Sequence, residues 1–182
     1  MFVAVDLPGA VKAALASRVA PYRDRIPGAR WTGSDGWHVT VKFLGATWPR
    51  LVEEVDRAVG AAASSTGSFE SALTIVGVFP SARRARVVWA GLADTEGRFG
   101  GIVKLLDENL MEHFEPERRA FTPHLTLVRL NPPRDVGEFV PDLIGASVAS
   151  DSFPVDALVL YRSHLSPRGA TYEPLRSFPL AK

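Results

Sequence analysis

The apolar residues of this chain recur with two spacings, one typical of strands and one typical of helices. Runs of successive or alternating apolar residues predict β-strands at residues 2–6, 37–44, 69–79, 86–92, 124–130, 155–163 and 171–180. Apolar residues three or four positions apart predict helices at 11–19, 51–62 and 99–114, and a weaker pattern predicts a short helix within 136–145. Strands and helices occur in both halves of the chain, so the pattern predicts an α+β fold.

Two of the predicted strands contain the same order of residues: histidine, apolar, threonine, apolar. The first copy is His38-Val39-Thr40-Val41 and the second is His124-Leu125-Thr126-Leu127, which Asn131-Pro132-Pro133 is expected to end. Successive side chains of a strand point to opposite faces, so each histidine shares a face with its threonine. A packed face would favour Val or Ile at those positions. The two copies therefore favour a functional role, and their spacing of about half the chain suggests a duplicated α+β unit.

Two histidines with two hydroxyls are suited to acid/base chemistry at a phosphate. The pKa of an unperturbed imidazole is about 6.5, so near neutral pH one copy can accept a proton while the other donates one. In-line displacement at phosphorus places the attacking and leaving groups on opposite sides, which facing histidines match. Thr40 and Thr126 would donate hydrogen bonds to phosphate oxygens. A metal site is disfavoured because neither motif contains a carboxylate or thiolate. His113 and His164 are expected to be structural.

Composition narrows the class of protein. The 182 residues are 46% hydrophobic and 23% charged, as in an ordinary globular domain. The chain has no cysteine, which excludes disulfides, thiolate metal sites and a cysteine nucleophile. The formal net charge is +1, so a nucleic-acid partner must be held by a local basic patch. No apolar run is long enough to span a membrane. We expect a cytoplasmic monomer with no membrane attachment.

Several basic and aromatic residues are candidates for binding a substrate. Lys42 has the strand parity of His38 and Thr40, whereas Arg129 has the opposite parity to His124 and reaches the same face only if the strand twists or bulges. The candidates for stacking on a base are Phe43, Tyr172, Trp37, Phe79 and Tyr161, although Phe43 and Phe79 suit the core better. The remaining cations comprise a cluster at a predicted hairpin tip and a pair before the second motif: Arg83, Arg84, Arg86, Arg118 and Arg119.

Five segments together resemble a known family, the RNA 2′,3′-cyclic phosphodiesterases, also called 2′-5′ RNA ligases, of the two-histidine (2H) phosphoesterase superfamily. In chain order they are FVAVDLP from Phe2, WHVTVKFLG from Trp37, GVFPSARRARVVWAGL from Gly77, FTPHLTLVR from Phe121 and LYRSHLSPRGATYEPL from Leu160. The resemblance covers nearly the whole chain.

This resemblance implies one domain over residues 1–182, built from two interleaved, pseudo-symmetric lobes. Each lobe would hold an antiparallel sheet flanked by helices, with the His38 motif in one, the His124 motif in the other and an active-site groove between them. The family hydrolyses the 2′,3′-cyclic phosphate at an RNA 3′ end to a 2′-phosphate without a cofactor, and some members join tRNA halves reversibly through a 2′-5′ bond. By the same resemblance, His38 is the proton donor and His124 the proton acceptor.

Two other functions fit the same residues. In the first, the site is unchanged but its substrates are small cyclic nucleotides or 2′-5′ oligonucleotides. In the second, the histidines and arginines form a binding module that recognises an RNA end without turnover. The first alternative is distinguished from RNA hydrolysis by comparing the rates on a mononucleotide and on an oligomer with a cyclic-phosphate end. Tight binding of an oligonucleotide without formation of product would favour the second.

Overall fold

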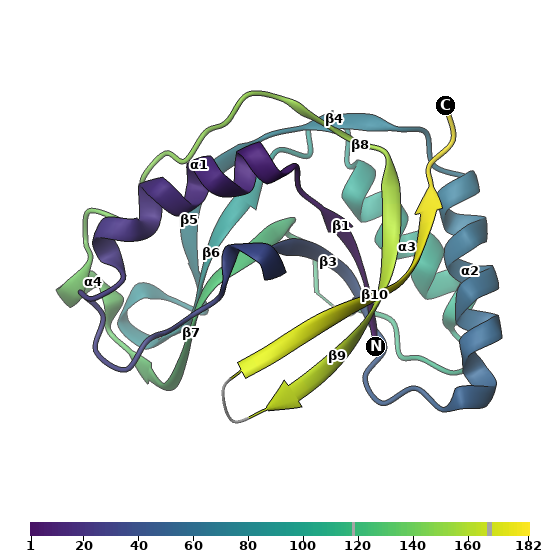
Figure 1. Ribbon diagram of the computed structural model, residues 1–182, viewed down its shortest axis with the longest axis horizontal. Coiled ribbons are helices and arrows are strands. Elements are labelled where there is room, and N and C mark those ends of the chain that lie inside the picture. Colours follow the sequence, from purple (N-terminus) through teal and green to yellow (C-terminus); the bar gives the residue numbers. More distant parts are fainter. Residues whose placement is uncertain (118, 167–168) are drawn as a thin grey trace.

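Two four-stranded antiparallel sheets carry the two motif strands, one strand each (Figure 1). The computed structural model describes residues 1–117, 119–166 and 169–182. The first sheet has the order β10-β9-β1-β3 and the second has the order β2-β7-β6-β5. The first motif forms β3 (His38–Phe43) and the second begins β7 (His124–Arg134). The predicted α+β class with antiparallel sheets is confirmed.

The first sheet is built from both ends of the chain. Its other strands are β1 (Phe2–Asp6), β9 (Ala157–Ser166) and β10 (Gly169–Pro179). Apolar residues on one face, such as Val3 and Val39, belong to the main core. On the opposite face Phe2, Ala4 and Tyr161 form a second, smaller cluster. This sheet is therefore covered by the main core on one face only, and the aromatic cluster occupies the other.

The second sheet comes from the middle of the chain. It contains β2 (Arg30–Trp31), β5 (Leu73–Phe79), β6 (Ala85–Leu92) and β7. The strand β2 leads directly toward β3 of the first sheet, so one short segment of chain, residues 32–37, joins the two sheets. A separate two-stranded ribbon pairs β4 (Phe69–Ser71) with β8 (Phe153–Val155).

Three longer helices bury apolar faces against the sheets. They are α1 (Gly9–Val19), α2 (Val52–Ser64) and α3 (Arg98–Leu110), with a short α4 (Val136–Phe139) and 3-10 turns at Ala20–Tyr22, Ser34–Gly36, Pro49–Leu51 and Ala82–Arg84. In Figure 1 α1 lies at the end of the molecule that holds β5, β6 and β7, whereas α2 and α3 lie at the end beyond β1. Burial of Val55, Val59 and Leu106 joins α2 and α3 to the main core.

The structure departs from the predicted elements in three places. The predicted strand at 69–79 is two strands in different sheets, and β2 and β8 are too short to leave a periodic pattern. The prediction that Asn131-Pro132-Pro133 ends the second motif strand is wrong, because β7 continues to Arg134. Beyond Arg129, β7 no longer pairs with β2 and becomes an edge of the sheet. Prolines are tolerated there because an edge strand does not need every N–H for hydrogen bonds to a neighbour. The predicted turn residues Pro167 and Arg168 lie outside the described residues.

No helix in the described part of the chain combines the length and the apolar character needed to cross a membrane.

Candidate active site

His38 begins β3 and shares one face of the first sheet with Thr40. Both side chains are half-buried, whereas Val39 and Val41 are buried in the main core on the other face. Strand alternation produces this separation, as the sequence pattern predicts. Within the described residues, the Thr40 hydroxyl has no hydrogen-bond partner in the protein. A donor on this face is thus available to a ligand.

Three aromatic rings surround the His38 imidazole. The Phe2 ring stacks on it with centroids 4.7 Å apart, and the Tyr172 ring meets it edge-on at 4.9 Å. Tyr161 stacks behind Phe2 at 5.2 Å and donates a 2.6 Å hydrogen bond from its hydroxyl to Asp6 Oδ2. Burial, together with this hydrogen bond, raises the pKa of Tyr161, so the phenol stays protonated as the donor. These contacts fix the plane of the imidazole.

The same burial controls the protonation of His38. Loss of solvation lowers its pKa from 6.5 to about 4. The negative charge of Asp6 and a backbone hydrogen bond at Gly36 oppose this shift, whereas the positive charges of Lys12 and Arg129 reinforce it. The imidazole is therefore neutral at pH 7 in the free protein, and an anionic ligand would favour its protonated form.

His124 occupies the corresponding place on β7. It shares a half-buried face with Thr126, and Leu125 and Leu127 are buried on the other face. Its Nδ1 atom lies 2.6 Å from the carbonyl oxygen of Thr122, so a proton on Nδ1 leaves Nε2 as the free acceptor. Burial lowers the pKa of His124 as well. Within the described residues, the Thr126 hydroxyl also lacks a partner in the protein.

Aromatic rings support His124 as they support His38. The Phe79 ring meets it edge-on at 5.1 Å, and the Trp89 ring lies 6.0 Å away. The indole of Trp89 covers Gly77, its cross-strand partner, where a Cβ atom would stand only 2.1 Å from the ring. Gly77 is thus required for the close approach of strand and indole that places Trp89 beside His124.

Each motif strand contains a β-bulge one residue after its threonine. In β3 the pairing with β1 skips Val41, and in β7 the pairing with β6 skips Leu127. A bulge places two successive side chains on the same side and reverses the parity beyond it. Val41 and Lys42 are accordingly both buried, as are Leu127 and Val128. The next residues, Phe43 and Arg129, return to the faces of the histidines.

The bulge corrects the prediction for Lys42, which is wrong in placing this side chain beside His38 and Thr40. Lys42 is 5% exposed and lies on the core side of the sheet. Its ammonium pairs with the carboxylate of Asp107 on α3 and donates a 2.7 Å hydrogen bond to the Glu115 carbonyl. Asp107 Oδ2 also accepts a 3.1 Å hydrogen bond from the Glu117 N–H. Lys42 thereby ties β3 to the loop that leads toward His124.

Arg129 lies within electrostatic reach of both histidines. Its positive charge lowers the pKa of His38 and of His124, although the two belong to different sheets. The strands β3 and β7 are themselves in contact. From strand alternation alone, Arg129 would point away from the His124 face. The bulge at Leu127 reverses this, so that Arg129 points to the same face as His124. One guanidinium is therefore shared by the two motif faces.

The other predicted binding residues differ in how close they lie to the histidines. Tyr172 contacts the His38 ring, and Phe43, which is 69% exposed, lies 6.3 Å from Phe2. Arg84 and Arg86 are exposed at the β5–β6 connection, and no contact joins either one to a motif residue in the described chain. Arg118 lies outside the described residues.

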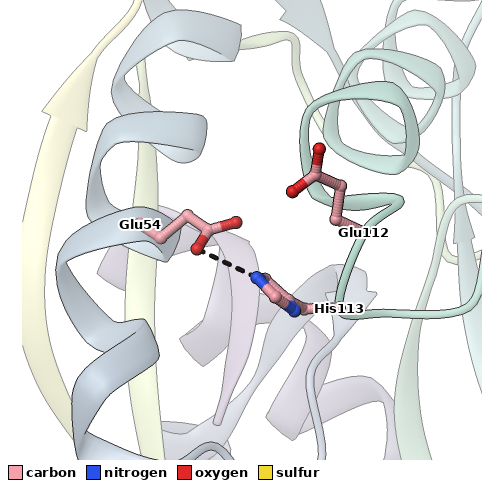
Figure 2. Close-up of side chains that lie close together, drawn as sticks. All are labelled: Glu54, Glu112 and His113. Atoms are coloured by element: carbon pink, nitrogen blue, oxygen red, sulfur yellow. Dashed lines mark ion pairs between the residues drawn. The ribbon is translucent and has the colours of Figure 1, made fainter.

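A second group of chemically capable side chains lies away from the motif faces. Glu54 of α2 and Glu112 and His113, which follow α3, point toward one another (Figure 2). His113 Nε2 lies 3.2 Å from Glu54 Oε2, a contact between partly exposed side chains of α2 and of the segment after α3, and such contacts contribute little to stability. The helices α2 and α3 pack on the core face of the first sheet, opposite the face that carries His38.

Sequence reasoning missed Phe2 and names Tyr161 and Phe79 only as candidates for stacking on a base. Phe2 and Tyr161 pack beside His38 and Phe79 packs beside His124, but the three come from strands whose pairing no local pattern reveals. Asp6 was missed for the same reason, although it is the cross-strand partner of His38. The available signal was the position of Phe2 and Asp6 at the two ends of a predicted strand.

The chain matches a protein-family model described as LigT like Phosphoesterase over residues 5–89 and 94–172. A curated relative from Methanothermobacter thermautotrophicus, named RNA 2′,3′-cyclic phosphodiesterase, is 31% identical over 98% of this chain and 97% of its own length. A second of the same name, from Geobacillus stearothermophilus, is 28% identical; 98% of this chain spans 56% of that protein. A solved structure from Thermus thermophilus is 27% identical with a TM-score of 0.78, covering 98% of this chain and 96% of that one.

Proposed function

Since this chain belongs to the LigT-like phosphoesterase family, we propose that it hydrolyses the 2′,3′-cyclic phosphate at the 3′ end of RNA to a 2′-phosphate. The observation that carries the proposal is the matched pair of motif faces. Each presents a half-buried imidazole and a threonine hydroxyl, and both lie near one guanidinium. The relative from Methanothermobacter thermautotrophicus supports the choice of substrate through its name.

In the proposed reaction His124 acts on the attacking water. Its Nδ1 proton is directed to the Thr122 carbonyl, so Nε2 is the atom that accepts a proton from water. The water oxygen forms a bond to phosphorus while the bond from phosphorus to the ribose 3′ oxygen breaks. His38, protonated in the complex, gives its proton to the departing 3′ oxygen. The assignment of donor and acceptor follows the family resemblance.

Substrate binding would favour uptake of a proton from solvent by His38, which is neutral in the free protein. Its pKa of about 4 leaves it neutral near pH 7. A phosphate anion beside the imidazole favours the charged form and raises that pKa. The acid would thus be charged chiefly when a phosphate is in place, which couples its protonation to substrate binding.

The remaining groups would hold the phosphate and the terminal nucleotide. Thr40 and Thr126 donate to the non-bridging oxygens, because each hydroxyl lies on its histidine's face and no described protein group uses it. Arg129 offsets the negative charge of the phosphate. Tyr172 and the exposed ring of Phe43 are placed to stack on a base.

Product analysis on a short RNA that ends in a 2′,3′-cyclic phosphate tests this proposal. We expect conversion to an RNA ending in a 2′-phosphate, at a rate unchanged by a chelator because acid and base are both supplied by imidazoles. The same reaction is run with His164→Gln, which alters an exposed imidazole paired with Glu173 and should keep the full rate. A 3′-phosphate product, or none, would show the proposal to be wrong.

A further inference from the structure

Arg30 is the cross-strand partner of Arg129. The pairing of β2 with β7 sets Arg30 directly opposite Arg129 and Trp31 directly opposite Val128. Directly opposite residues of an antiparallel pair point to the same face of the sheet. Val128 is buried and Trp31 packs against the main core, so Arg30 and Arg129 both point to the other face, which carries His124.

The cross-strand partners of Arg129 on the other strands of the second sheet form a row that confirms this orientation. Arg129 is opposite Val87 on β6, and Val87 is opposite Phe79 on β5. The Phe79 ring contacts His124, so the row from Arg30 to Phe79 lies on the His124 face. Thr126 pairs with Trp89, two residues from Val87, which puts the row about 7 Å along the strand from Thr126.

The two neighbouring positive charges of Arg30 and Arg129 favour binding of an anion between them. Like charges directly opposite one another destabilise a sheet, and Cβ atoms in such pairs are about 5 Å apart. Within the described residues, neither guanidinium has a carboxylate partner or another side-chain hydrogen bond. A phosphate accepts paired hydrogen bonds from a guanidinium and would relieve the repulsion.

One phosphate does not need both arginines. A 2′,3′-cyclic phosphate carries a single negative charge on two non-bridging oxygens, and Thr40, Thr126 and Arg129 already supply donors to them under the proposed function. Arg30 lies one strand farther out, on the edge strand of the second sheet. It therefore has donors left for a second anion beside the first.

We propose that Arg30, paired with Arg129, forms a subsite for the phosphodiester one nucleotide 5′ of the cyclic end. This inference rests on the proposed function and specifies its substrate class. RNA that ends in a cyclic phosphate continues only on the 5′ side, so a second phosphate of the substrate must come from there. The subsite makes the protein select oligonucleotides over cyclic mononucleotides, which lack that phosphate.

The test compares Arg30→Gln with the unmodified protein on three substrates. They are a nucleoside 2′,3′-cyclic phosphate with a free 5′ hydroxyl, a dinucleotide with a cyclic end, and the same dinucleotide with a neutral methylphosphonate linkage. We expect Arg30→Gln to lower kcat/KM about tenfold on the charged dinucleotide, mainly through KM, and to leave the other two substrates unchanged. Arg57→Gln, an exposed arginine on α2, is the matched control and should change none of the rates.

Equilibrium binding separates the subsite from the reaction. Calorimetry with the product dinucleotide, which ends in a 2′-phosphate, should show binding about tenfold weaker in Arg30→Gln, with the salt slope reduced by about 0.7. Equal effects of Arg30→Gln on all three substrates, or none on the charged dinucleotide and its product, would overturn the subsite. If the unmodified protein turns over none of the substrates, the proposed reaction fails, and the binding result still decides the subsite.

Discussion

The hydroxyl of Thr32 donates a 2.7 Å hydrogen bond to the backbone carbonyl of Thr126. The Trp37 indole N–H in turn donates to this hydroxyl at 2.7 Å, so the hydroxyl hydrogen must be directed to a carbonyl. Trp37 directly precedes His38 and is 1% exposed. The segment that leads to one motif is thus bound to the strand that carries the other.

Replacing Thr32 with Val should loosen this connection. The change keeps the shape of the side chain but leaves the buried Trp37 N–H without its partner, which costs about 1–3 kcal/mol of folding stability. It also frees the Thr126 carbonyl, so we expect kcat to fall severalfold, and Thr32→Ser to restore it. Thr66→Val removes another buried hydroxyl, which donates to the Ala62 carbonyl of α2, and should lower stability without changing kcat. Equal kcat in all of these variants would contradict a positioning role.

Replacing Lys42 tests whether this residue stabilises the fold or binds the substrate. Lys42→Met leaves the Asp107 carboxylate in a largely buried place without its partner, and we expect unfolding in urea to show a loss of about 3 kcal/mol. A double change that also replaces Asp107 with Leu should recover much of that loss. A raised KM at unchanged stability would instead place Lys42 at the substrate.

Gly77 should be the glycine at which alanine is tolerated least. A Cβ atom there would collide with the Trp89 ring, which must move away from His124. We expect Gly77→Ala to lose at least about 2 kcal/mol of stability and most of the activity. Gly100→Ala in α3 meets nothing within 4 Å and should stabilise the protein by about 0.5–1 kcal/mol. Comparable stability in the two variants would contradict this prediction, because it would mean that the Trp89 ring can move aside at little cost in free energy.

Neutral His38 should make stability depend on pH. Its pKa is about 4 in the folded protein and near 6.5 when unfolded, so the unfolded chain binds the extra proton first. The stability contribution is complete above pH 6.5 and is lost as the pH falls toward 4, by up to about 3 kcal/mol. His38→Gln should weaken this dependence in urea unfolding at pH 7 and pH 4.5 and leave the part that comes from His124, whose pKa burial also lowers. His113→Gln, an exposed imidazole, should retain it, and identical pH dependence in His38→Gln would refute the assignment.

Local patterns were enough to predict the α+β class and the two motif strands, because alternation and helical spacing are set by burial of one face. They could not reveal the bulges at Val41 and Leu127, since a bulge depends on how a strand pairs with its neighbour. Lys42 was misplaced for that reason. Arg30 was overlooked because its two-residue strand has no periodicity, and its importance comes only from lying opposite Arg129.

The most direct test of the paired-histidine account is the single-turnover rate of His38→Ala, His124→Ala and the double variant on a cyclic-phosphate-ended RNA. Groups that act on the same transition state are not additive, so each single change should lower the rate about a hundredfold or more and the double change should be little slower than either. Circular dichroism should show all three variants folded. A single variant that keeps the full rate would contradict the account.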